Sequence, residues 1–251
     1  MKLAAVIITY NEAHNISRCL ESVHFCDEVV VVDSNSQDDT IAIAKRYTTH
    51  VYSRQWEGYA AQKNYAVSLT SADWILSIDA DEVVSSALAD EILSVIGKNG
   101  VCDAFSIPRK TIHFGRWIRY GGWYPNRLVR LCRQGRGVWI GDQLHERWEI
   151  TGEVGTLRND LLHYSFRNLA DQVQRNNQYS SLGARHLKQM GAQYSLSKLL
   201  LKPITKFGET YLLKRGFLDG FPGFIISVSA AYSVFLKWAK LWELENGSQE
   251  V

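Results

Sequence analysis

Three carboxylates stand close together in the first third of the chain, directly after an apolar run. Residues 74–78 read Trp-Ile-Leu-Ser-Ile, and Asp79, Asp81 and Glu82 follow them. Such a run, ended by acids, predicts a buried strand that stops where the chain meets water. If the strand persists through Asp81, then Asp79 and Asp81 leave the same face and repel each other unless a cation lies between them. Hard divalent cations prefer such oxygens, so the segment indicates either a metal site or a strand end with solvated acids.

The elements around these acids predict the sheet that would position them. Apolar runs at 3–8, 28–32 and 50–53 precede the run at 74–78, and helical patterns separate them, including one from Glu57 to Leu69. Strands that alternate with helices predict a parallel sheet sandwiched between helices, with ligands at the carboxyl ends of the strands.

Polar residues follow three of the predicted strands and would therefore line one edge of the sheet. Thr9, Tyr10 and Glu12 follow the first strand, Asp33 follows the second, and the acids from Asp79 follow the fourth. Neither a G-x-G-x-x-G motif nor a P-loop motif follows the first strand, which argues against dinucleotide and P-loop binding. A nucleotide at this edge would need a metal to neutralise its phosphates.

Composition limits the classes of function. The 251 residues are 46% hydrophobic and 22% charged with a net charge of +2, which is too weakly basic to argue for a nucleic-acid partner. The four cysteines have no C-x-x-C spacing, as expected of reduced thiols in a cytosolic protein. The apolar start of the chain is better explained by a first strand than by a signal peptide.

Three ordered motifs resemble the sugar-nucleotide half of glycosyltransferase family 2, an inverting family with the GT-A fold. They are residues 6–12 (VIITYNE), residues 30–34 (VVVDS) with 38–40 (DDT), and residues 77–82 (SIDADE). The resemblance implies an α/β fold of the GT-A type, in which a Rossmann-like, mostly parallel central sheet is flanked by helices. It also implies a UDP-sugar donor and a divalent metal, Mg²⁺ or Mn²⁺.

Roles for individual residues follow from the same resemblance. Asp33 would accept a hydrogen bond from the base, and Asp79 and Asp81 would hold the metal on the diphosphate. Residues 62–64 (QKN) resemble a loop beside the nucleotide, so Lys63 is a candidate contact, and an exposed surface lysine is the alternative. The expected nucleotide site consists of Thr9, Tyr10, Glu12, Asp33, Lys63, Asp79, Ala80 and Asp81.

The second half of the chain should bind and activate the acceptor. Residues 141–147 (GDQLHER) contain a Leu-His-Glu motif that resembles the base-supplying motif of a bacterial branch of the family, which implies Glu146 as general base. Asp142 is the second candidate, and His145 would orient the carboxylate or touch a phosphate. The alternative for Glu146 is an ion pair with Arg147 or Arg127.

Three further side chains are candidates for this half of the site. His163 is a candidate third metal ligand, because neutral imidazole can coordinate, or else a buried structural histidine. Trp123 is a candidate sugar-stacking side chain, and Arg127 is a candidate contact to the acceptor or its phosphate.

The last third is basic and then apolar. Five basic residues between Lys198 and Arg215 precede residues 220–236, which carry no charge. A helix over those seventeen residues would span about 25 Å, less than the roughly 30 Å hydrocarbon core, and Pro222 and Gly223 would shorten it. A helix lying in the headgroup region of an anionic leaflet is expected, with a core helix as the alternative.

Residues 213–223 and 235–243 resemble the tail of enzymes that add a sugar, typically glucose, to the heptose region of the lipopolysaccharide inner core. The resemblance implies a lipid-anchored, phosphorylated acceptor at the cytoplasmic face of a bacterial inner membrane, with Arg215 as a phosphate contact. The expected organisation is a sugar-nucleotide half at 1–110, an acceptor half at 111–166 and a helical, membrane-associating region at 167–251.

The sequence therefore predicts transfer of glucose from UDP-glucose to an inner-core heptose by a peripheral membrane enzyme. The alternatives are another envelope glycan or lipid-linked acceptor, a nucleotidyltransferase, and a non-catalytic envelope-assembly scaffold.

Overall fold

A computed structural model describes residues 1–97, 100–141 and 146–247 of the chain. It divides into two compact units: residues 1–110 with 126–164 form unit 1, and residues 111–125 with 165–251 form unit 2. The three-part functional division expected from the sequence stays a prediction.

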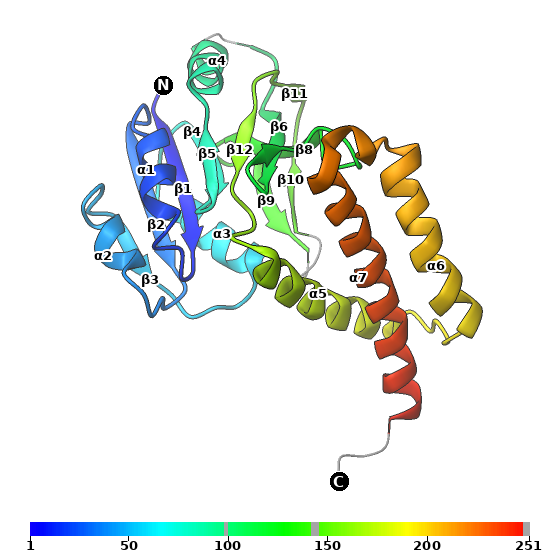
Figure 1. The fold of residues 1–251 in the computed structure, drawn as a ribbon. Helices are drawn as coiled ribbons and strands as arrows, with labels where there is room; N and C mark the ends of the chain where they lie inside the picture. The colour runs from blue at the N-terminus through cyan, green and yellow to red at the C-terminus, as the bar shows by residue number, and fades with distance from the viewer. Residues whose placement is uncertain (98–99, 142–145, 248–251) are drawn as a thin grey trace. The chain divides into compact units, whose positions relative to one another are not determined.

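Unit 1 is built on a mixed sheet whose first four strands are parallel (Figure 1). The strand order β3-β2-β1-β4 places the first strand in the chain beside the second and the fourth. These strands are β1 (Leu3–Thr9), β2 (Glu28–Asp33), β3 (Val51–Ser53) and β4 (Trp74–Asp79). These bounds confirm the four strands predicted from the sequence. Their runs of apolar residues fit a sheet that is covered on both faces.

Helices cover both faces of these strands. Side chains alternate along β1, so Leu3, Ala5 and Ile7 pack with α1 (Ile16–Ser22), α2 (Thr40–Ala44) and α4 (Ser86–Ile96). Val6 and Ile8 point to the other face, where Ala66 of α3 (Tyr59–Ser68) covers them.

The sheet continues past β4 through strands from the middle of the chain. The antiparallel strand β8 pairs with β4 and is followed by β6, β12 and β5. A separate antiparallel hairpin, β9–β10, packs its tryptophans on the same face as α3. The remaining strands are β5 (Glu82–Val84), β6 (Ala104–His113), β8 (Asn126–Arg133), β9 (Gly137–Ile140), β10 (Arg147–Ile150), β11 (Val154–Thr156) and β12 (Leu161–His163).

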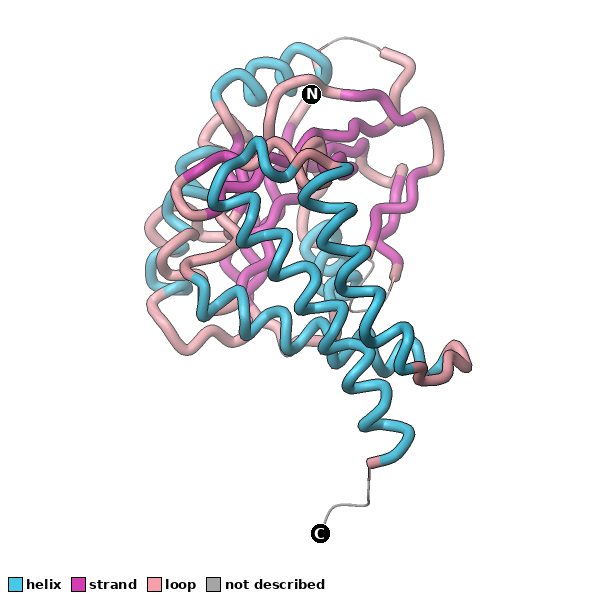
Figure 2. The backbone as a smooth tube through the Cα atoms, turned by 45° about the vertical axis from the view of Figure 1, so that its right-hand side comes forward, coloured by secondary structure: helices cyan, strands magenta, loops and turns pink. Residues whose placement is uncertain are grey.

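Unit 2 is mainly helical (Figure 2). The small strand β7 (Arg116–Trp117) pairs with the end of β6, and α7 lies beside both α5 and α6. The helical segments are α5 (Leu169–Gln189), α6 (Leu196–Gly208), a π-helical turn (Glu209–Leu213), a 3₁₀ turn (Gly216–Asp219) and α7 (Gly220–Asn246). The small core of this unit joins Ala184 of α5 to Trp238 and Leu241 of α7, with Leu199 of α6 packed against them.

The length expected for the apolar C-terminal helix is wrong. α7 has 27 residues, roughly 40 Å at 1.5 Å per residue, because Pro222 lies in its first turn, where a missing N–H costs no helical hydrogen bond. Of the described helices, the segment Gly216–Asn246 has the length and apolar composition to cross a membrane, and 22% of its most apolar window is buried.

Candidate active site

The strand register brings the predicted donor residues to one edge of the sheet. Thr9 pairs with Asp33 across β1 and β2, and Ile8 pairs with Asp79 across β1 and β4. The carboxyl ends of these three strands therefore meet, as the sequence predicts. Asp33 is fully buried and accepts hydrogen bonds from the backbone N–H (2.7 Å) and the hydroxyl (2.5 Å) of Ser36.

Thr9 and Gln62 each carry a polar atom that is unsatisfied within the described part of the chain. The Thr9 hydroxyl and the Gln62 Oε1 are buried and have no hydrogen-bond partner among the described residues. The Gln62 amide nitrogen donates to Ser34 Oγ at 3.0 Å, so the side chain is fixed while its oxygen stays unpaired. Buried polar atoms are normally satisfied, so these two mark a place where a polar ligand would complete the bonding. Tyr10 is 54% exposed.

The acids after β4 do not share one face. β4 ends at Asp79, and Ala80 and Asp81 form a turn before β5 begins at Glu82. The condition that the strand persists through Asp81 is therefore not met, and the two aspartates take different partners.

Asp79 lies between two buried cations. Its Oδ2 accepts from Arg130 Nη2 at 2.6 Å, and its Oδ1 lies 3.1 Å from Lys63 Nζ, an ion-pair distance without hydrogen-bond alignment. Burial alone would raise the pKa of the Asp79 carboxyl, but the charges of Arg130, Lys63 and Arg109 outweigh it and hold that pKa well below its usual range.

The same cations bind Glu82, which is fully buried. Arg130 Nη2 donates to Glu82 Oε1 at 2.7 Å, and Arg109 Nη1 donates to the same oxygen at 3.1 Å. Burial would lower the pKa of Arg130, but Asp79 and Glu82 outweigh it and raise that pKa. Arg130 and Glu82 were not among the predicted site residues.

Asp81 pairs with His163, which was also predicted as a metal ligand. Asp81 Oδ2 lies 3.3 Å from His163 Nε2 at the end of β12, and the Asp81 carbonyl accepts from the Tyr164 N–H at 2.8 Å. A carboxylate oxygen and an imidazole nitrogen this close together are two donors that could hold a divalent ion between them. The described residues contain no cluster of three or more candidate metal ligands, so any ion here would take its other ligands from phosphate and water.

Lys63 also reaches the predicted base. Its ammonium is 1% exposed, which excludes an exposed surface lysine, and it donates to Glu146 Oε1 at 3.3 Å. The indole of Trp139 lies beneath the same ammonium, with its ring centroid 4.5 Å from Nζ. The buried Lys63 ammonium thus joins Asp79, at the end of β4, to Glu146, which directly precedes β10.

The neighbouring residue Asn64 fixes that hairpin to α3. Its Nδ2 donates to the Trp139 carbonyl at 2.8 Å, and its Oδ1 accepts from the Trp139 N–H at 2.9 Å. Trp139 stacks on Trp148 across the hairpin with ring centroids 5.0 Å apart. The predicted alternative partners of Glu146 are engaged elsewhere, since Arg147 pairs with Glu149 and Arg127 donates to the Leu157 carbonyl. Asp142 and His145 lie outside the described residues.

Two further candidates, Trp123 and Arg215, belong to unit 2. Trp123 is half-buried in unit 2, where its ring packs edge-on against His113 with centroids 5.6 Å apart. Arg215 is exposed in unit 2 and has a left-handed backbone (φ 56°). Their predicted contacts with the acceptor stay predictions, as does that of Arg127.

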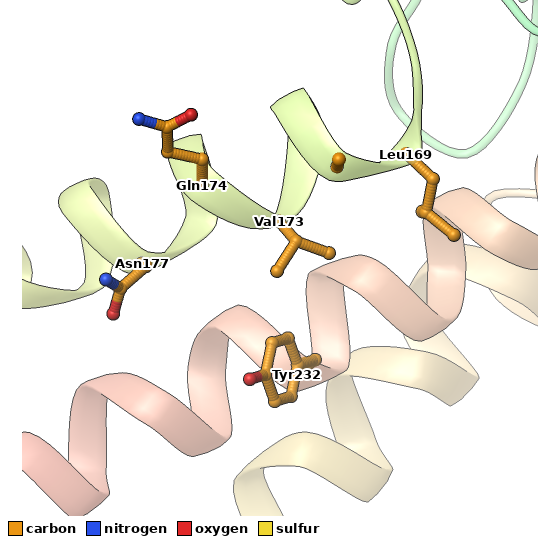
Figure 3. Close-up of a pocket in the computed structure, with 6 residues that line it drawn as sticks. Leu169, Val173, Gln174, Asn177 and Tyr232 are labelled. Carbon is orange, nitrogen blue, oxygen red and sulfur yellow. The ribbon is translucent and has the colours of Figure 1, made fainter.

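A cavity of about 580 Å³ lies in unit 2 between α5 and α7 (Figure 3). Its lining has no carboxylate or imidazole, so it cannot supply a general base or a metal site. The lining residues are Leu169, Ala170, Val173, Gln174, Asn177 and Tyr232.

The mixed sheet, with polar residues at the carboxyl ends of its parallel strands and helices on both faces, has the architecture of the GT-A fold. Solved structures share the fold. The glucosyl-3-phosphoglycerate synthase of Mycobacterium tuberculosis, solved with Mn²⁺, UDP and glucosyl-3-phosphoglycerate, has a TM-score of 0.52 at 15% identity, over 77% of this chain and 81% of that one. The mannosyltransferase of Pyrobaculum calidifontis, solved with GDP-mannose and Mn²⁺, has a TM-score of 0.51 at 14% identity, over 99% and 76%.

The chain belongs to glycosyl transferase family 2, whose family model matches residues 4–156. A glycosyltransferase of Rickettsia felis without an assigned activity is 34% identical over 96% of this chain and 90% of its own length. The lipopolysaccharide core biosynthesis glycosyltransferase LpsC of Rhizobium meliloti is 30% identical over 97% of this chain and 93% of its own length. The protein is therefore a glycosyltransferase, which argues against the nucleotidyltransferase and scaffold alternatives.

Proposed function

We propose that this glycosyltransferase moves glucose from UDP-glucose to a heptose of the lipopolysaccharide inner core, with inversion at the anomeric carbon. The observation that carries the proposal is the Lys63 bridge, because one buried ammonium contacts both Glu146, the proposed base, and Asp79 at the end of β4. The likeness to LpsC, a lipopolysaccharide core enzyme by its name, supports the class of acceptor.

The donor would lie across the carboxyl ends of β1, β2 and β4. Asp33 would accept a hydrogen bond from the uracil, and the unpaired Thr9 hydroxyl and Gln62 Oε1 would bind other polar atoms of the nucleotide. Asp81 and His163 would hold a divalent ion, which when bound would supply neutralisation of the charge on the leaving diphosphate. Asp79, already bound by Lys63 and Arg130, would fix the edge of the site and not the ion.

Glu146 would activate the acceptor. Lys63 holds Oε1, and the other oxygen, Oε2, would remove the proton from the acceptor hydroxyl as that oxygen attacks the anomeric carbon. The bond from that carbon to the diphosphate oxygen breaks on the opposite face, so an α-linked donor gives a β-linked product. UDP leaves with the bonding electron pair, and Glu146 returns the proton to solvent.

The acceptor would be anchored in lipid, so the enzyme would work at the cytoplasmic surface of the inner membrane as a peripheral protein. The basic residues between Lys198 and Arg215 are the sequence feature that supports this location.

Replacement of Glu146 by glutamine tests the proposed base. We expect the Glu146→Gln variant to lose about 10²- to 10⁴-fold in turnover while UDP-glucose still raises its melting temperature, because the amide keeps the shape but accepts no proton. Glu149→Gln is the matched control, since Glu149 lies on the same hairpin and is 58% exposed. Near-normal turnover in purified Glu146→Gln would remove Glu146 from the mechanism.

Replacement of Asp81 by asparagine tests the donor site separately. We expect Asp81→Asn to lose the Mn²⁺-dependent part of UDP-glucose binding in calorimetry, because one of two proposed protein ligands loses its charge. The same assay with UDP-galactose tests the identity of the sugar, and tighter binding of that donor would replace glucose in the proposal.

A further inference from the structure

The helix α6 of unit 2 carries an apolar face that nothing within the described residues covers. Leu196, Leu200, Leu201 and Ile204 are 60%, 55%, 59% and 68% exposed. Leu196, Leu200 and Ile204 are spaced four residues apart, so they lie along one side of the helix. Exposed leucine and isoleucine side chains gathered on one helix face mark an interaction surface.

This face is not needed to hold α6 in place. The helix packs on α7 through other side chains, among them Leu199, which joins Trp238 and Leu241 in the small core of unit 2. The apolar surface continues after α6, where Leu212 and Leu213 of the π-helical turn are 60% and 80% exposed. Exposed apolar side chains are therefore present both on α6 and in the turn that follows it.

Basic side chains lie along one edge of that surface. Lys198 is three residues before Leu201 and so lies next to it on the helix, and Lys202 follows Lys198 four residues later; both lysines are exposed. Lys206, the next in this stripe, pairs with Glu209. Residues 196–215 hold five basic residues and one acidic residue, a net charge of +4 in a chain whose total is +2. The rest of the chain is thus slightly acidic, and the positive charge is concentrated beside the exposed leucines.

We propose that this α6 face inserts into the headgroup region of an anionic lipid surface. An apolar helix face edged by lysines is the composition of an interfacial helix, because the leucines enter the acyl boundary while the lysines meet lipid phosphates. A second copy of the chain suits the face less well, since it would bring two lysine stripes together. This membrane contact deepens the proposed peripheral location and rests on it. It lies on α6, whereas the sequence predicted a membrane-surface helix at residues 220–236.

Flotation of the purified full chain with lipid vesicles tests the inference. Vesicles of phosphatidylcholine alone are compared with vesicles that also contain phosphatidylglycerol. We expect binding to the anionic vesicles, at least tenfold weaker binding for Leu200→Ser/Ile204→Ser, and loss of the anionic preference for Lys198→Gln/Lys202→Gln. Val101→Ser/Met190→Ser is the matched control, because Val101 and Met190 are 80% and 73% exposed outside this face, and it should bind like the wild type.

Three results would overturn the inference. They are absence of wild-type binding, unchanged binding of Leu200→Ser/Ile204→Ser, and a stable dimer in solution that this variant converts to a monomer. Thermal shift with UDP-glucose on the same samples shows that the variants are folded. Transfer to a deacylated, water-soluble acceptor separates the two proposals. Wild-type transfer without vesicle binding contradicts only the α6 inference, and vesicle binding without any transfer contradicts only the proposed function.

Discussion

Lys63 is the central side chain in the group of ion pairs at the end of β4. A buried ammonium is strongly destabilising unless it is paired, and Lys63 has two carboxylate partners and an aromatic face. Arg130 pairs with both Asp79 and Glu82, and Arg109 pairs with Glu82. Three cations and three carboxylates thus balance at the strand end, and loss of Asp79 would remove one partner from both Lys63 and Arg130.

The first prediction concerns the acid sensitivity of this cluster. Because the pKa of Asp79 is lower in the folded chain than in the unfolded chain, its ionised form stabilises the fold, and that stability is lost as the pH falls below about 4. In Asp79→Asn we expect the free energy of unfolding at neutral pH to fall by roughly 2–3 kcal/mol. This is the low end for a buried pair, because the side chain is 26% exposed.

Urea denaturation at neutral and acid pH measures both effects. The variant should lose less stability than the wild type on acidification. Asp90→Asn, at an exposed position on α4, should follow the wild type at every pH. Parallel pH curves for Asp79→Asn and the wild type would show that Asp79 is not the group that links acidity to stability.

These residues also show what the sequence could predict. The acids could be predicted as site residues because an apolar strand leads directly into them. In the structure, the strand register brings Thr9, Asp33 and Asp79 to one edge of the sheet. The partners were not visible, because Arg130 lies 51 residues from Asp79 and Glu146 lies 83 residues from Lys63. A lysine reads as a surface residue until the fold shows which carboxylates surround it.

At the scale of elements, α3 links two parts of the proposed site. One is the sheet edge that would bind the donor, and the other is the β9–β10 hairpin next to Glu146. Three consecutive residues do this, since Gln62 binds Ser34, Lys63 binds Asp79 and Glu146, and Asn64 binds the Trp139 backbone. The helix itself was predicted within two residues at each end. Its contact with the hairpin was not, because no local pattern encodes a side chain that pairs with a distant backbone.

The second prediction tests this link. In Asn64→Ala we expect a loss of about 2 kcal/mol in unfolding free energy, because two hydrogen bonds to the Trp139 backbone disappear. We also expect a lower kcat with an unchanged KM for the donor, since the hairpin carries Glu146 and the strand ends would hold the nucleotide. Ser68→Ala at the exposed end of the same helix is the control. Equal kcat in Asn64→Ala and the wild type would mean that the hairpin holds its place without α3.

The third prediction concerns the start of α7. A Cβ at Gly223 would lie 1.9 Å from the Gly216 carbonyl oxygen, a contact that the backbone must move to relieve. We expect Gly223→Ala to cost about 1–3 kcal/mol of stability. Gly208→Ala is the matched control, because its Cβ meets nothing within 4 Å and its helical backbone favours alanine by about 0.5–1 kcal/mol. Urea denaturation of both variants checks the opposite signs, and a stable Gly223→Ala would contradict the tight packing of this turn.

At the scale of the whole molecule, the length and apolar composition of α7 must be weighed against its polar contacts with α5. The sequence overestimated the effect of Pro222, so the argument that α7 is too short to cross a bilayer does not hold. The side chains around α7 give a different argument. Lys240 donates to the Asn177 carbonyl and Oδ1, both at 2.6 Å, and to Ser181 Oγ at 2.7 Å, while Asn176 donates to Ser229 Oγ at 2.6 Å. α7 is therefore tied along its length to the polar helix α5, which would have to enter the hydrocarbon core with it or lose these bonds.

The fourth prediction follows from this attachment and concerns how the full chain leaves a membrane. We expect high salt to release part of the membrane-bound chain, because the lysine contacts with lipid phosphate are screened, and alkaline carbonate to release the remainder. A spanning helix stays with the bilayer under both treatments. Lys240→Met tests the tie itself: it removes the bonds to α5 and leaves α7 more apolar, so a larger share of this variant should resist carbonate. Wild-type protein that stays with the bilayer after carbonate treatment would show that α7 crosses the bilayer despite its hydrogen bonds to α5.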